Sequence, residues 1–139
     1  QIEVTELMEN ALGVPIMEAH LSRDMILVLQ TEKDVYEVVP DLDIVSKIPG
    51  CVNLIITAQG READFVSRYF TPGISIPEDP VTGSAHSSLI PFWAKRLGKE
   101  KLTAHQLSKR GGILYCQDKG DRVKISGNAI LYLAGEIYL

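Results

Sequence analysis

The sequence is short of basic residues, of cysteine and of long apolar runs, and each shortage excludes a class of protein. With 14 Lys and Arg against 18 Asp and Glu, the net charge is −4, so the chain lacks the basic footprint of a nucleic-acid-binding protein. No apolar run approaches the roughly 18 residues that cross a membrane. The two cysteines, Cys51 and Cys116, lie in apolar runs and are expected to be buried free thiols in a reducing cytoplasm.

Two kinds of catalytic pattern are also missing. The three histidines, His20, His86 and His105, show no metal-ligand spacing, so no metal site is expected. Asp79, Ser84 and His86 supply the residue types of a hydrolase triad, but the sequence has no Gly-x-Ser-x-Gly turn to expose a nucleophilic serine. A hydrolase is therefore disfavoured.

The 139 residues are 45% hydrophobic, which is enough for a single domain over residues 1–139 with a substantial core. Short helices are expected at residues 6–12 and 41–47. Residues 1–20 are otherwise difficult to assign. Apolar runs and alternating patterns predict strands at residues 23–30, 35–39, 52–57, 64–70, 102–110, 112–117, 122–126 and 129–139.

The chain is organised around one apolar helix, which is expected to begin at the small residues 82–84 and to end before Gly98. Residues 89–93 are apolar without interruption, so several faces of this helix are hydrophobic and it belongs inside the domain. Pro91 is expected to kink it. Many strands around one such helix predict an α+β domain, in which a curved, barrel-like mixed β-sheet wraps a central buried helix.

The loop before this helix carries the candidate chemistry. The first turn of a helix presents free N–H groups and the positive end of the helix dipole, so an anion is expected near Thr82, Gly83 and Ser84. Asp79, a few residues upstream, places an acid–base group beside that anion. A small carboxylate substrate would meet an anchor and a proton-handling group in one place. The alternative is an ordinary helix cap with Asp79 solvated in a turn.

The motif EDPVTGSAH at residues 78–86 resembles the signature of the PhzF-like isomerases of phenazine biosynthesis, which are relatives of diaminopimelate epimerase. Four further segments support the resemblance in the same order. They are DFVSRYF at residues 64–70, QLSKRGG at residues 106–112, RVKISG at residues 122–127 and the closing GE at residues 135–136. The resemblance extends from about residue 20 to the C-terminus.

This resemblance implies two similar lobes that face each other across a cleft, of which the chain matches only the second, C-terminal lobe. Residues 1–20 would then be a crossover between the lobes. The family's main catalytic glutamate belongs to the first lobe, so the chain alone is expected to be inactive and to need that missing N-terminal lobe as its partner. The resemblance also implies a homodimer that requires no cofactor.

By the same resemblance, Gly83, Ser84 and Thr82 bind the substrate carboxylate, and Asp79 assists the proton transfer. Diaminopimelate epimerase has a cysteine where this chain has Thr82, and threonine supplies no thiolate at neutral pH, so a two-thiol mechanism is disfavoured. Arg68 either binds substrate or braces the loop through Glu78, and the bracing role is preferred. The alternative to an isomerase is a non-catalytic module for small-anion binding or dimerisation.

Overall fold

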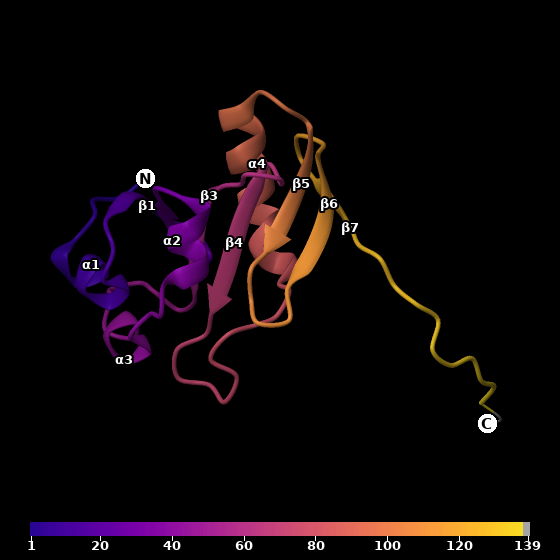
Figure 1. Ribbon diagram of the computed structural model, residues 1–139, viewed down its shortest axis with the longest axis horizontal. Helices are drawn as coiled ribbons and strands as arrows, with labels where there is room; N and C mark the ends of the chain where they lie inside the picture. The colour runs from indigo at the N-terminus through magenta and orange to yellow at the C-terminus, as the bar shows by residue number, and fades with distance from the viewer. Residues whose placement is uncertain (138–139) are drawn as a thin grey trace.

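The computed structural model describes residues 1–137 and places seven strands in one open mixed sheet, in the order β1-β2-β3-β4-β5-β6-β7 (Figure 1). The strands are β1 (Ile16–Leu21), β2 (Met25–Leu29), β3 (Leu54–Gln59), β4 (Phe65–Phe70), β5 (Lys101–Gln106), β6 (Gly112–Asp118) and β7 (Val123–Ser126). The helices are α1 (Glu6–Leu12), α2 (Glu32–Glu37), α3 (Leu42–Val45) and α4 (Gly83–Leu97).

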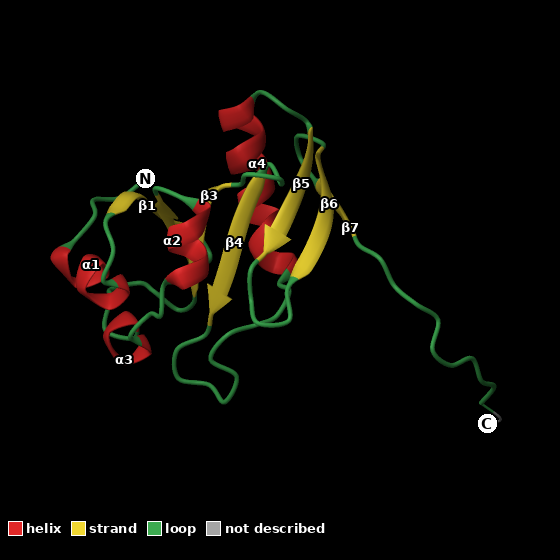
Figure 2. Ribbon diagram, viewed as in Figure 1, coloured by secondary structure: helices red, strands yellow, loops and turns green. Residues whose placement is uncertain are grey.

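Two parallel pairs interrupt an otherwise antiparallel sheet, and each is joined by a helical crossover. Helices α2 and α3 connect β2 to the parallel strand β3, and α4 connects β4 to the parallel strand β5. The two crossovers start from β2 and β4. These strands run in opposite directions, because β2 is parallel to β3 and β3 is antiparallel to β4. Right-handed crossovers from them therefore place their helices on opposite faces of the sheet. Helices α1, α2 and α3 accordingly group apart from α4 (Figure 2).

Alternate side chains of β4 point to opposite faces of the sheet and pack into two different core clusters. Val66 and Phe70 belong to a core cluster with α1–α3, whereas Phe65 and Tyr69 belong to a second cluster under α4. The first cluster takes its strand residues from β1–β4, while the second extends as far as Leu114 of β6. Helices α1–α3 therefore leave one face of β5–β7 without a helical cover, and we call it the open face.

Helix α4 begins and ends where the sequence predicts, and Gly98 follows it in the left-handed conformation (φ 65°). One side of α4, including Leu89 and Trp93, is buried against the sheet, whereas Pro91 is exposed. The α+β class with a mixed sheet is confirmed. A barrel-like closure and a helix wrapped on all sides are not confirmed, because β1 and β7 remain separate edges of the sheet.

Two sequence predictions of strands are wrong. Residues 35–39 are not a strand, because a capping box between Thr31 and Asp34 starts α2 and carries it to Glu37. This local cap outweighs the strand-like run that follows, in which Val39 stays exposed. Residues 129–137 belong to no helix or strand. Residues 138–139 of that second prediction lie outside the described residues.

The N-terminal segment holds one predicted and one unpredicted element. Helix α1 ends at Gly13 as expected, whereas β1 was not predicted. The N–H of Ile2 donates to the carbonyl of Ala19 over 2.9 Å, which ties the start of the chain to the free edge of β1. The crossover role of residues 1–20 stays a prediction.

Both cysteines are free thiols, as predicted, but only Cys116 is buried, whereas Cys51 is half-buried. Burial raises the pKa of the Cys51 thiol and of the Cys116 thiol to about 11 each, so neither is a nucleophile near neutral pH. None of the helices in the described part of the chain is long and apolar enough to cross a membrane.

Candidate functional site

The loop between β4 and α4 folds back along β4 and so brings Asp79 to the start of the helix. Glu78 forms an isolated bridge with Phe70, and the N–H of Asp79 donates to the carbonyl of Tyr69 over 3.0 Å. Neighbouring side chains on an extended segment point to opposite faces. Glu78 therefore points toward the α2 face, and Asp79 toward the α4 face.

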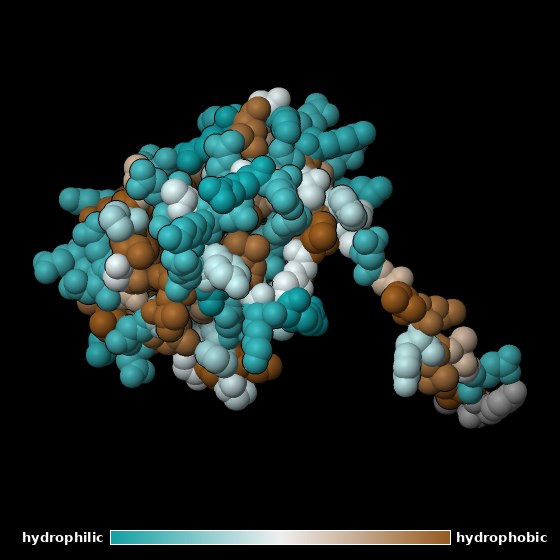
Figure 3. Space-filling model, viewed as in Figure 1, coloured by the Kyte–Doolittle hydropathy of each residue, from teal (hydrophilic) through white to brown (hydrophobic). Residues whose placement is uncertain are grey.

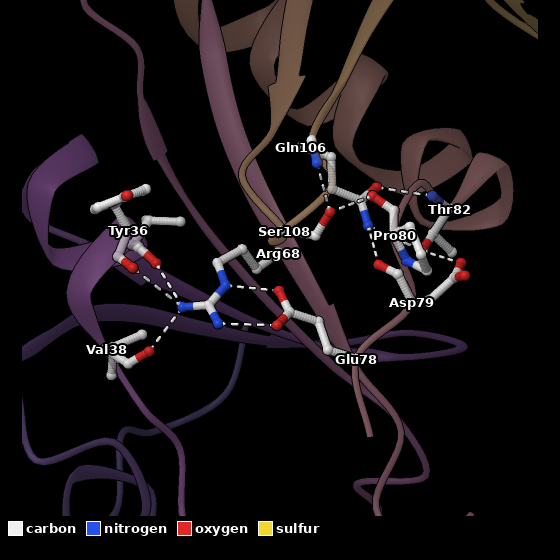
Figure 4. A network of polar contacts seen from close by, with 11 residues as sticks. Tyr36, Val38, Arg68, Glu78, Asp79, Pro80, Thr82, Gln106 and Ser108 are labelled. Carbon is white, nitrogen blue, oxygen red and sulfur yellow. Dashed lines mark hydrogen bonds and ion pairs between the residues drawn. The ribbon is translucent and has the colours of Figure 1, made fainter. Parts of the chain in front are cut away.

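Arg68 braces this loop against α2 (Figure 4). Its Nε and Nη2 atoms donate to the two carboxylate oxygens of Glu78 over 2.7 and 3.0 Å. Its Nη1 atom donates to the carbonyls of Val35, Tyr36 and Val38 at the end of α2, over 3.2, 3.3 and 2.7 Å. These contacts use all three nitrogens of the guanidinium, so the bracing role preferred from the sequence is the one that the geometry supports.

Gln106, at the end of β5, fixes the other side of the loop (Figure 4). Its side-chain carbonyl accepts from the N–H of Thr82 over 2.7 Å. Its side-chain amide donates to the carbonyl of Asp79 over 2.8 Å and to the hydroxyl of Thr82 over 3.2 Å. That hydroxyl then has its proton free to donate to Oδ2 of Asp79, over 2.5 Å. The half-buried Asp79 is thereby held as a hydrogen-bond acceptor.

The segment after β5 presses on the same loop. The hydroxyl of Ser108 donates to the carbonyl of Pro80 over 2.7 Å and accepts from the N–H of Gly111 over 3.1 Å. A Cβ atom at Gly112 would lie only 2.3 Å from a methyl carbon of Val81. Glycine at this position therefore permits the close approach of β6 to the loop.

The first turn of α4 has no side-chain cap. Thr82 occupies the N-cap position, but its hydroxyl bonds to Asp79 and not to the helix amides. The N–H groups of Gly83 and Ser84 point out of the positive end of a 15-residue helix and are available to an anion. Asp79 accepts from Thr82 and does not cap the first turn of α4, and the anion site at this turn stays a prediction.

A cleft of about 570 Å³ opens beside this turn, and Gly83, Arg110, Ile113 and Asn128 are among its lining residues. An adjoining hollow of about 540 Å³ is lined by Glu78, Ser108 and again Arg110. The guanidinium of Arg110 is exposed and adds positive charge to the region in front of the helix. Both charge contributions favour a negatively charged ligand.

His86 supports Thr82 from inside the helix. It is fully buried, and its Nδ1 lies 2.8 Å from the carbonyl of Thr82. Because a carbonyl only accepts, Nδ1 carries the proton, and Nε2 has no hydrogen-bond partner in the described structure. Burial lowers the pKa of His86, against an opposing effect of the bond to Thr82. The neutral ring is engaged with Thr82, so this geometry does not support the hydrolase reading with Ser84.

The structure thus brings Asp79, Thr82, Gly83 and Ser84 together as predicted. Gln106 was not predicted as part of the site. The sequence does contain a sign of its role. Gln106 is a polar residue at a position of β5 that continues the alternate buried positions, two residues after the buried Ala104. Among the described residues, no group of three or more His, Cys, Asp or Glu side chains could hold a metal ion.

The chain is similar in sequence and in fold to known proteins. A family model described as phenazine biosynthesis-like protein, PhzC-PhzF, matches residues 3–135. An uncharacterized isomerase of Pseudomonas aeruginosa is 46% identical over 140 residues, which cover 100% of this chain and 53% of that protein. The chain therefore spans about half the length of the relatives that it matches.

Solved structures agree with the sequence comparison. The crystal structure of a phenazine biosynthesis protein of the PhzF family from Enterococcus faecalis matches with a TM-score of 0.91 and 47% identity. The X-ray structure of a phenazine biosynthesis PhzC/PhzF protein from Clostridium difficile matches with a TM-score of 0.87 and 45% identity. Each match covers 99% of this chain and 53% of the other chain.

Proposed function

Because the chain belongs to the PhzC-PhzF family of phenazine biosynthesis-like proteins, we propose that it forms the C-terminal half of an isomerase that moves a proton on a small carboxylate substrate. The observation that carries this proposal is the position of Asp79 at the uncapped first turn of α4. An acid–base group and an anion anchor there lie within a few residues of each other. The relatives named isomerases support the reaction class.

In this proposal the substrate carboxylate binds the N–H groups of Gly83 and Ser84, where the helix dipole favours negative charge. The cleft next to Gly83 is large enough for a small molecule, and Arg110 adds to the attraction. Thr82 positions Asp79 by donating to it. The carboxylate of Asp79 then assists the migrating proton, and general acid–base catalysis of this kind typically contributes about 10²- to 10⁴-fold in rate.

The remaining machinery would come from the part of the intact protein that this chain does not cover. We propose that the principal acid–base glutamate lies there, so this chain alone is inactive. The reaction needs only positioned proton donors and acceptors, and no cofactor is required. Closure of the two lobes would exclude water from the cleft. We further propose a cytoplasmic homodimer of the intact protein.

The competing proposal is a non-catalytic module that binds small anions. It uses the same helix turn and gives Asp79 no chemistry. The two proposals differ in the fate of the ligand, because only the isomerase exchanges a ligand proton with solvent.

Amide resonances of this chain test the shared first step. Titration with acetate or sulfate is expected to shift the ¹⁵N–¹H signals of Gly83 and Ser84, while amides of α2 stay in place. The matched variant Arg110→Gln is expected to weaken the binding without abolishing it, because the helix amides remain. Unmoved Gly83 and Ser84 signals at saturating anion would refute the anchor.

A further inference from the structure

Gln106 is a buried polar side chain that takes no part in the proposed chemistry. It is 1% exposed and ends β5, where the register pairs it with Ser67 of β4. The N–H of the next residue, Leu107, donates to the carbonyl of Ser67 over 2.8 Å. The side chain of Gln106 therefore starts from a fixed point of the sheet and reaches across to the loop before α4 (Figure 4).

The partners of Gln106 allow only one orientation of its side-chain amide. The backbone N–H of Thr82 can only donate, so the amide oxygen faces it, over 2.7 Å. The carbonyl of Asp79 can only accept, so the amide nitrogen faces it, over 2.8 Å. The two partners agree, and the same nitrogen also donates to the hydroxyl oxygen of Thr82 over 3.2 Å.

This orientation leaves the hydroxyl hydrogen of Thr82 with one acceptor. Gln106 donates to the hydroxyl oxygen, so the hydrogen of that hydroxyl has to point to another group. Within the described part of the chain, the acceptor is Oδ2 of Asp79, 2.5 Å from the hydroxyl oxygen. The carbonyl of Thr82 is held separately by His86. The hydrogen bonds therefore run in one direction, from Gln106 through Thr82 to Asp79.

The two carboxylate oxygens of Asp79 differ as a result. Oδ2 accepts from Thr82. Oδ1 accepts no hydrogen bond from the described residues, and it is not among their buried atoms without a partner, so it is open to solvent. A proton that migrates from a bound ligand to Asp79 therefore finds Oδ1 free and Oδ2 occupied.

We propose that Gln106 is a positioning residue of the proposed isomerase. Through the hydroxyl of Thr82 it holds Asp79 as a proton acceptor and reserves Oδ1 for the migrating proton. When that proton leaves a C–H bond of the substrate, an O–H bond forms at Oδ1 and the electron pair of the C–H bond stays on the substrate. This inference rests on the proposed function and adds the residue that sets the direction in which Asp79 works.

Gln106→Glu tests this direction, because glutamate has nearly the same shape and cannot donate when it is ionised. One of its oxygens still accepts from the N–H of Thr82. The other replaces the amide nitrogen, so it draws the Thr82 hydroxyl away from Asp79. The assay is deuterium incorporation from D₂O into a panel of small 2-hydroxy, 2-amino and unsaturated carboxylic acids by the intact protein.

We expect the turnover number of Gln106→Glu to fall at least about tenfold, because a misplaced catalytic group is costly. The Michaelis constant should change less than about threefold, since the proposed carboxylate anchor at Gly83 and Ser84 is untouched. A turnover number close to wild type would overturn the inference. So would a loss that appears only in the Michaelis constant.

Gln117→Glu is the matched control. Gln117 follows the buried Cys116 on β6 and therefore points to the open face. The surface over β5 and β6 is largely hydrophilic in the space-filling view (Figure 3), so an added carboxylate there stays in water. Its turnover number should match the wild type. An equal loss in Gln117→Glu would show that added negative charge, and not position 106, is responsible.

A double variant separates action through Thr82 from a general loosening of the loop. If Gln106 acts through the Thr82 hydroxyl, Thr82→Val already removes the route by which Gln106→Glu does harm. The double variant should then turn over no more slowly than the slower single variant. Multiplied losses would show that Gln106 acts independently of Thr82 and would overturn the inference.

The side-chain N–H signals of Gln106 in this chain give a readout without substrate, which also serves if Gln106→Glu does not fold. Both protons should exchange with water more slowly than those of Gln117, because both are hydrogen-bonded. Thr82→Val should shift one of them and leave the proton on the carbonyl of Asp79 in place. Two fast-exchanging protons, or two unmoved ones in Thr82→Val, would contradict the direction proposed.

The two proposals fail in different ways. If Asp79→Asn loses deuterium incorporation and Gln106→Glu does not, this inference is wrong and the proposed function stands. If the wild-type intact protein incorporates no deuterium into any acid of the panel, the proposed function is wrong and this inference falls with it.

Discussion

The hydroxyl of Thr82 donates to Oδ2 of Asp79 over 2.5 Å, and this contact determines what the first turn of α4 presents. A threonine at the N-cap commonly uses its hydroxyl to satisfy a helix amide. Here that hydroxyl turns back to the loop, and the helix has no side-chain cap. The same contact therefore holds an acidic group in place and leaves the amides of Gly83 and Ser84 open to a ligand.

Removing the Thr82 hydroxyl should destabilise the loop. Thr82→Val keeps the shape of the side chain but removes the hydroxyl that donates to Asp79 and accepts from the amide of Gln106. The amide of Gln106 keeps its bond to the carbonyl of Asp79, whereas the Asp79 carboxylate loses its donor. We expect a loss of about 1–3 kcal/mol in the free energy of unfolding, the usual cost of an unsatisfied buried group. Thr82→Ser, which keeps the hydroxyl, is the matched control. Urea unfolding measures both, and equal stability of the two variants would contradict this role.

Arg68 should resist replacement by lysine. A lysine keeps the positive charge but cannot bond both oxygens of Glu78 and the three carbonyls at the end of α2. We expect Arg68→Lys to lower the free energy of unfolding by about 2 kcal/mol, in the range for hydrogen bonds to charged groups. The control is the opposite exchange, Lys33→Arg, at an exposed position of α2, and it is expected to leave the free energy of unfolding nearly unchanged. If Arg68→Lys unfolded like the wild type, the guanidinium would not be bracing the loop.

Gly112 should tolerate no methyl group while Val81 is present. The Cβ of Gly112→Ala would lie 2.3 Å from Val81 Cγ2, and valine has little freedom to rotate away. We expect a loss of about 1–3 kcal/mol from overpacking. The double variant with Val81→Ala should recover most of that loss in thermal unfolding. A single variant as stable as the wild type would show that the loop moves aside without cost.

His86 should make the stability depend on pH. Burial lowers the pKa of the folded-state imidazole below its ordinary value of 6.5, so the unfolded chain binds the extra proton more readily. The contribution is fully present above pH 6.5 and is lost as the pH falls toward the folded-state pKa. The slope is at most about 1.4 kcal/mol per pH unit for one proton.

Unfolding measured between pH 5 and 8 checks this. His86→Gln should remove the slope below pH 6.5, because glutamine does not titrate. Glutamine is chosen because its side-chain amide can still donate to the carbonyl of Thr82. His105→Gln should keep the slope. An unchanged slope in His86→Gln would assign the pH dependence to another group.

Local signals in the sequence sufficed for α4. Small residues at its start, Gly98 at its end and the apolar run between them define the helix without reference to the rest of the chain. The run from Val35 to Val39 misled because its strand-like residues follow a capping box at Thr31 and Asp34. Local capping chemistry started a helix there, and only Val35 of its residues had to be buried.

Non-local features were not accessible from the sequence. Gln106 lies 27 residues after Asp79 and meets it only because β5 pairs with β4 in the register Ser67–Gln106. Residues 129–137 have the apolar composition of a strand, but a strand also needs a neighbouring edge. The sheet of this chain does not pair with these residues, so the prediction of a strand there is wrong. Asp79 and its motif were recognisable, whereas the partners that hold Asp79 depend on the fold.

The central claim is that Asp79 handles a proton on a bound carboxylate. The intact protein is incubated in D₂O with a panel of small carboxylic acids, and deuterium entering their C–H positions is followed by NMR. Asp79→Asn is near-isosteric but exchanges no proton. The matched control is Asp43→Asn, at an exposed position in α3.

We expect Asp79→Asn to slow deuterium incorporation by about 10²-fold or more, within the range for general acid–base groups. Turnover number and specificity constant should fall together, while Asp43→Asn stays close to wild type. If Asp79→Asn incorporates deuterium at nearly the wild-type rate, Asp79 only supports the loop and the central claim is wrong.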